Sequence, residues 1–253
     1  MALIPNKESG DHVLVLLEGI HLTKQFGGVT ALKGVDFSLA EGQIVGLIGP
    51  NGAGKTTLFN IVAGAFKPSS GKVIFDGQDI TALLPHKICR GGIARTFQVA
   101  RPFDEMTCHE NVRVAAINRA RKEHHEEWDI LVEESLEFVN LRHQADSLAK
   151  DLNLIQKKRL ELARALATDP KLLMLDEVLG GLNTQEISQA IELIQKLRDI
   201  RGLTIFWIEH VMGAIMSGAD RVIVLDQGEK LMEGTPDEVV NDSRVIKAYL
   251  GDA

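Results

Sequence analysis

Short apolar runs recur along the chain and predict a series of β-strands. Most are five to seven residues long, and they occur at residues 13–17, 35–39, 43–48, 71–77, 93–97, 172–175, 204–208 and 221–225. Helical sequence separates the later runs, notably at residues 184–200. Because apolar strands that alternate with helices are typical of α/β proteins, we expect a mainly parallel sheet with both faces covered. Residues 225–231 predict a hairpin.

The pattern of apolar and charged residues changes between about residue 100 and residue 168. Strand signals disappear there, and charged, helix-forming sequence replaces them at residues 110–128, 130–139 and 155–167. We therefore expect a helical subdomain inserted into the α/β domain. The polar residues 1–12 lack the charged-then-apolar pattern of an export signal. They predict a short mobile leader before a domain that spans residues 13–253.

A glycine-rich segment joins the predicted strand at residues 43–48 to a helix that ends at Gly64. It fits the pattern G-x-x-x-x-G-K-[ST], in which backbone amides and a helix N-terminus surround phosphate groups. The candidate phosphate-binding residues are Gly49, Pro50, Asn51, Gly52, Ala53, Gly54, Lys55, Thr56 and Thr57. Lys55 would neutralise the β- and γ-phosphates, and the Thr56 hydroxyl would bind Mg²⁺. The alternative is a glycine-rich turn with an incidental lysine, but the flanking strand and helix favour a nucleoside triphosphate site.

Two carboxylates, Asp176 and Glu177, end the apolar run at residues 172–175. Successive side chains on a strand point to opposite sides, so the two groups can do different work. Asp176 can hold Mg²⁺, and Glu177 can accept a proton from an attacking water. The alternative is that both are solvated carboxylates at a strand end. The predicted phosphate loop in the same chain favours the functional interpretation over this one.

Two further side chains follow predicted strands. His210 is the second residue after the run at 204–208, and as a neutral imidazole it could donate a hydrogen bond to a γ-phosphate. Gln98 follows residues 93–97, and its amide could reach Mg²⁺ or the attacking water. The alternatives are a structural histidine and an ordinary surface glutamine.

Composition and charge narrow the class of protein. The chain is 45% hydrophobic and 25% charged, which is ordinary for a globular protein. With 28 Lys and Arg against 35 Asp and Glu, the net charge is −7, so we expect no nucleic-acid partner. Cys89 and Cys108 give no metal-ligand spacing, and we read residues 124–127 (HHEE) as a solvated helical face, not as a metal site.

In this order, the motifs resemble those of the ATP-binding subunits of ABC transporters. The resemblance adds an adenine-stacking aromatic at Phe26, a signature region at residues 152–156 and a D-loop at residues 180–183. It implies a P-loop NTPase fold of the ABC ATPase type, with a mainly parallel core sheet, an antiparallel β subdomain and an inserted helical subdomain. It assigns catalytic roles to Lys55, Gln98, Glu177 and His210, and Mg²⁺ ligation to Thr56, Gln98 and Asp176.

Residues 92–107 and 245–251 resemble the branched-chain amino-acid importer subgroup of this family. That resemblance implies an ATPase at the cytoplasmic face of the plasma membrane, using ATP and Mg²⁺ to drive uptake. It implies two permease subunits that contact a groove lined by Phe103 and the residues after Gln98, and indirectly an extracytoplasmic solute-binding protein. Importers of urea or other amides, and a soluble or regulatory ABC protein, are the alternatives.

The signature region departs from the family pattern Leu-Ser-Gly-Gly-Gln, because this chain has Leu-Asn-Leu-Ile-Gln at residues 152–156. In the family, these residues bind the ATP held by a second ATPase subunit. Asn153 and Gln156 could still offer polar groups, but their spacing also fits a helix capping box. Val178 replaces the proline that usually follows the catalytic glutamate. We expect pairing with a different ATPase subunit that has an intact signature, with a homodimer as the alternative.

Overall fold

The computed structural model describes residues 3–5, 12–98, 101–117 and 125–250. One of its two sheets is antiparallel, with β2 in contact with three neighbours. Its strands are β1 (Leu3–Pro5), β2 (His12–Phe26), β3 (Val29–Ala40), β5 (Ser70–Phe75) and β6 (Gln78–Asp79). This sheet is the antiparallel β subdomain that the resemblance implies.

The second sheet has six strands in the order β11-β10-β4-β9-β8-β7. All neighbours pair in parallel except the hairpin of β10 and β11. The strands are β4 (Ile44–Ile48), β7 (Ile93–Arg95), β8 (Leu172–Asp176), β9 (Thr204–Ile208), β10 (Arg221–Asp226) and β11 (Glu229–Gly234). The predicted parallel core and the predicted hairpin are both confirmed.

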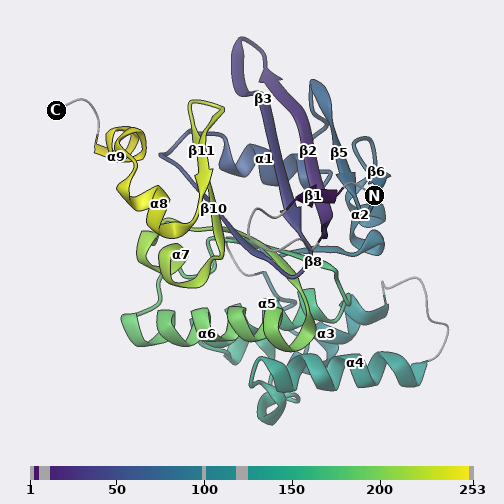
Figure 1. The fold of residues 1–253 in the computed structure, drawn as a ribbon. Coiled ribbons are helices and arrows are strands. Elements are labelled where there is room, and N and C mark those ends of the chain that lie inside the picture. Colours follow the sequence, from purple (N-terminus) through teal and green to yellow (C-terminus); the bar gives the residue numbers. More distant parts are fainter. Residues whose placement is uncertain (1–2, 6–11, 99–100, 118–124, 251–253) are drawn as a thin grey trace.

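Helices cover the central sheet (Figure 1). They are α1 (Lys55–Val62), α2 (Pro85–Gly91), α3 (Cys108–Ile117), α4 (His125–Phe138), α5 (Leu154–Leu166), α6 (Thr184–Arg201), α7 (Met212–Gly218), α8 (Pro236–Asn241) and α9 (Ser243–Leu250). Two short 3₁₀ helices lie at Arg142–Gln144 and Ala149–Asp151. Helices α3, α4 and α5 fall in the expected helical segment and lie on the opposite side of the central sheet from β2, β3 and β5 (Figure 1).

Alternate residues of each central strand enter different apolar clusters. In β8, Leu173 and Leu175 pack with the helical layer, while Leu172 and Met174 pack with α1 and the antiparallel sheet. This period of two buries the strand on both faces, so its side chains are apolar throughout. Packing on both faces thereby fixes the carboxyl end of β8, where Asp176 is the last strand residue and Glu177 follows it.

The N-terminal residues differ from the prediction. The predicted strand at residues 13–17 is the start of the much longer β2. Within residues 1–12, Leu3–Pro5 forms β1 and pairs with β2, so this described part of the expected leader is joined to the domain; the division at residue 12 stays a prediction. His124, like Val99 and Ala100 of the expected groove, lies outside the described residues.

Candidate active site

The glycine-rich segment forms the connection between β4 and α1. Gly52 and Gly54 adopt positive φ angles of 81° and 103°, which side chains other than glycine rarely allow. A Cβ at Gly54 would also lie 2.7 Å from the carbonyl oxygen of Ala31. Helix α1 then begins at Lys55, so its first amides face the loop. The local sequence therefore builds the amide-rich turn that an anionic ligand requires.

Lys55 lies inside this loop and is only 6% exposed. Its Nζ donates hydrogen bonds to the carbonyl oxygens of Gly49 (2.6 Å) and Pro50 (3.0 Å). Burial lowers the pKa of Lys55, and the charge of Glu177 partly opposes that effect. The cation is thus desolvated, which strengthens its attraction for any anion that reaches the loop.

Glu177 lies between two of the predicted catalytic side chains. Its Oε1 is 2.5 Å from Nε2 of His210, and its Oε2 accepts a hydrogen bond of 2.5 Å from Nε2 of Gln98. The three residues follow β8, β9 and β7, whose carboxyl ends meet at one edge of the parallel sheet. Glu177 itself has a φ of 50°, an uncommon angle for a residue with a side chain. Such backbone strain concentrates at functional sites.

A single cleft brings the glycine-rich loop together with Glu177 and His210. It is lined by Ala31, by the loop residues Asn51, Gly52, Ala53, Gly54, Lys55, Thr56 and Thr57, and by Glu177 and His210. A triphosphate seated on the loop would therefore place its terminal group beside the Glu177–His210 pair. That arrangement is what transfer of a terminal phosphoryl group to water requires.

A neighbouring cavity contains the residues predicted to bind Mg²⁺, because Thr56, Gln98 and Asp176 all line it. They offer hydroxyl, amide and carboxylate oxygens, the ligand types that Mg²⁺ prefers, so the donor set fits the ion. Asp176 is 6% exposed, and its Oδ2 accepts a bond of 2.6 Å from Arg95. Arg95 thus neutralises the carboxylate in this arrangement.

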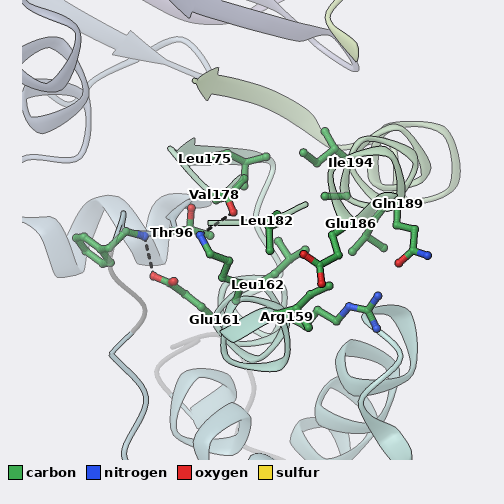
Figure 2. Close-up of a pocket in the computed structure, with 15 residues that line it drawn as sticks. Thr96, Arg159, Glu161, Leu162, Leu175, Val178, Leu182, Glu186, Gln189 and Ile194 are labelled. Carbon is green, nitrogen blue, oxygen red and sulfur yellow. Dashed lines mark hydrogen bonds between the residues drawn. The ribbon is translucent and has the colours of Figure 1, made fainter. Parts of the chain in front are cut away.

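The chain segments next to Gln98 and Glu177 are both bonded to α5. Figure 2 shows the two bonds as dashed lines, one at Glu161 and one at Val178. Lys158 Nζ donates to the carbonyl oxygen of Val178 at 2.8 Å, and Glu161 Oε1 accepts from the Phe97 amide at 2.6 Å. Burial lowers the pKa of Lys158 and raises that of Glu161. The same view shows the cavity between α5 and α6, with Leu162 and Leu182 among its apolar lining residues.

Two of the predicted site features lie away from this cleft. Phe26 is 43% exposed at the end of β2, contacts Phe66 edge-on at 5.4 Å between ring centroids, and is not among the cleft-lining residues. Asn153 and Gln156 form the expected capping box of α5, with bonds of 3.0 and 2.9 Å. The Asn153 side-chain oxygen is therefore occupied by its own helix.

Sequence reasoning missed Arg95 and Glu209. A cation inside a strand, three residues before Gln98, was the available signal for Arg95. Glu209 lies between the end of β9 and His210, and its Oε1 accepts a hydrogen bond of 2.8 Å from the Leu179 amide. It is 4% exposed, and burial raises its pKa. Nothing in the sequence around Glu209 indicated that its side chain is buried.

The parallel core, antiparallel sheet, helical layer and phosphate-loop cleft define an ATP-binding cassette. The sequence model of the ABC transporter family matches residues 32–180, and that of the branched-chain amino acid ATP-binding cassette transporters matches residues 229–253. The chain therefore belongs to the ABC transporter family, and the predicted ABC ATPase fold class is confirmed.

Particular relatives narrow the assignment. The chain is 42% identical to the high-affinity branched-chain amino acid transport ATP-binding protein BraF of Pseudomonas aeruginosa, over 94% of this chain and 98% of BraF. It is 39% identical to LivG of Escherichia coli, over 92% and 96%. A nucleotide-free ATP-binding cassette from an ABC transporter superposes with a TM-score of 0.86 at 31% identity, covering 94% of this chain and all of the other.

Proposed function

We propose that this chain is the ATP-hydrolysing subunit of an importer of branched-chain amino acids. The main support is one observation: the phosphate loop, Glu177 and His210 line a single cleft. The match of residues 229–253 to the branched-chain cassette transporters, and the names of BraF and LivG, support the solute class. Within the described residues no helix is both long and apolar enough to cross a bilayer. We infer that permease subunits attach the chain to the inner face of the plasma membrane.

The reaction is ATP + H₂O → ADP + phosphate. Lys55 and the loop amides would bind the β- and γ-phosphates, and Phe26 would stack on the adenine. Glu177 would accept a proton from the attacking water, while His210 would contact the γ-phosphate and orient Glu177. Thr56, Gln98 and Asp176 would hold Mg²⁺, which would neutralise charge on the phosphate oxygens. Binding of the ion would require Asp176 to exchange Arg95 for the metal.

We infer that the cassette works as a pair and that the pair contains a different ATPase subunit. Asn153 is committed to its capping box, and Leu154 and Ile155 bring bulk where the family has glycine. The signature would therefore bind the partner's ATP weakly, while the chain's own catalytic set is complete. Measuring ATP turnover of the purified chain, alone and with the partner, decides the matter: brisk turnover by the isolated homodimer contradicts a weakened signature.

Uptake measurements test the solute class. Membrane vesicles holding the assembled transporter should accumulate labelled leucine, isoleucine or valine when ATP is supplied, and Lys55→Ala should abolish that uptake. Uptake of urea or an amide, but not of these amino acids, would show that the proposed solute class is wrong and would leave the ATPase role intact. Co-purification with neither a permease nor a second ATPase would instead favour a soluble or regulatory protein.

A further inference from the structure

Gly49, the first residue of the phosphate loop, is bonded to Tyr249, the penultimate residue of helix α9. The Gly49 amide donates a hydrogen bond of 2.7 Å to the hydroxyl oxygen of Tyr249, a residue 200 positions away in sequence. Burial raises the pKa of Tyr249, so its side chain is a neutral hydroxyl at physiological pH. Tyr249 has no part in the roles proposed for phosphate binding, Mg²⁺ binding or water activation.

Gly49 is also fixed at its two other sides. Its carbonyl oxygen accepts the 2.6 Å bond from Lys55, and its Cα faces the backbone of β10. A Cβ added there would lie 2.1 Å from the carbonyl oxygen of Leu225, so no larger residue fits. The turn from β4 into the phosphate loop is therefore positioned by residues that follow it by about 175 to 200 places in the sequence.

Helix α9 is anchored independently of Tyr249. Val245 is 4% exposed and packs in the same cluster as Val239 of α8. The Asp242 side chain accepts bonds from the Arg244 and Val245 amides, and hydrogen bonding by Arg244 lowers the pKa of Asp242 to about 2. Helices α8 and α9 lie beside β10 and β11 (Figure 1). The hydroxyl of Tyr249 is thus presented to the loop by a helix that other contacts already hold.

We propose that Tyr249 is a positioning residue for the phosphate loop, fixing the Gly49 amide so that the following amides point into the nucleotide cleft. The inference rests on the proposed ATPase function and deepens it. It gives helix α9 an indirect part in nucleotide binding, through the Gly49 amide. A hydrogen bond that orders the loop before ATP arrives lowers the ordering cost of binding.

Replacing Tyr249 by phenylalanine tests the proposal, because the ring stays and only the hydroxyl leaves. We expect Tyr249→Phe to raise KM for ATP, and the Kd for Mg·ATP, by about 3- to 10-fold, with a smaller change in kcat. The control is Ile246→Val on the same helix, whose side chain is half exposed and has no bond to the loop. Equal KM and Kd values for wild type, Tyr249→Phe and Ile246→Val would overturn the proposal.

A spectroscopic measurement separates positioning from simple packing. Tyr249 is the single tyrosine of the chain, so growth with 3-fluorotyrosine gives one ¹⁹F resonance. That resonance should move during titration with Mg·ATP and stay fixed in the Lys55→Ala variant. A resonance that does not move while the wild type becomes saturated would contradict the proposal and leave the ATPase role intact. Failure of the wild type to bind Mg·ATP would overturn both.

Discussion

At the scale of single residues, the proposed chemistry depends on Glu177, whose two carboxylate oxygens each have a partner. His210 contacts one and Gln98 the other, each at 2.5 Å. A carboxylate held in this way has a fixed direction, which a general base needs in order to meet the proton of a positioned water. The water would have to take the place of one of these contacts, so either Gln98 or His210 is expected to shift when nucleotide binds.

Replacing Glu177 by glutamine should separate binding from hydrolysis. The amide is nearly isosteric but cannot accept the proton, so turnover should fall by about 10² or more while Mg·ATP still binds and the paired state lasts longer. Steady-state phosphate release and nucleotide titration measure the two effects. Glu192→Gln, at an exposed position on α6, is the matched control. Near-normal turnover in Glu177→Gln would remove this residue from the role.

Glu209 predicts a pH dependence of stability. Its pKa is raised by burial above the ordinary 4.5, so the stability that its protonated form contributes is present at low pH and is lost as pH rises through the raised value. Glutamine stays neutral and can still accept from the Leu179 amide. The melting temperature of Glu209→Gln minus that of the wild type should therefore grow between pH 4.5 and pH 8. A difference that is constant with pH, as expected for Glu192→Gln, would contradict this assignment.

At the scale of elements, α5 connects three parts of the site. Its first turn includes the end of the predicted signature region, residues 152–156, Lys158 donates to the carbonyl oxygen of Val178, and Glu161 accepts from the Phe97 amide. One helix thus contacts both the segment that carries Glu177 and the segment that carries its amide partner Gln98. The capping box that starts the helix is worth about 1 kcal/mol, so the start of α5 is stable without a nucleotide.

Replacing Lys158 by methionine tests this connection. The apolar stem stays, but the segment after Glu177 loses its bond, so kcat should fall by roughly 3- to 10-fold with little change in Mg·ATP affinity. Lys157→Met, at the neighbouring position with no side-chain bond to the Glu177 segment, is the control. Equal kcat values for the two variants would show that the contact is irrelevant to turnover.

At the scale of the whole molecule, the sequence predicts the central layer better than its edges. Strands such as β8 and β9 are buried on both faces and are therefore apolar throughout, which makes them readable as short runs. Strand β2 continues to Phe26, well beyond the predicted residues 13–17. Polar residues interrupt its second half, so that part of the sequence has no continuous apolar run. Helices α7, α8 and α9 are six to eight residues long, too short to show a clear helical period.

The sequence also predicts some residues of the candidate site and misses others. Lys55, Glu177 and His210 were predictable because each stands at a fixed place in a motif or at a strand end, and the parallel sheet then gathers strand ends at one edge. Arg95 and Tyr249 were not, since their partners lie 81 and 200 residues away and only the folded chain brings them together.

We propose that the loop after β4 binds a magnesium nucleotide through its amides and Lys55. Calorimetric titration of the purified chain with Mg·ATP tests it most directly, with Lys67→Ala, an exposed lysine, as control. We predict saturable binding of one nucleotide per chain in the wild type and in Lys67→Ala, and an affinity lower by about 10² or more in Lys55→Ala. The absence of binding heat in the wild type, or equal affinities in Lys55→Ala and Lys67→Ala, would contradict the account.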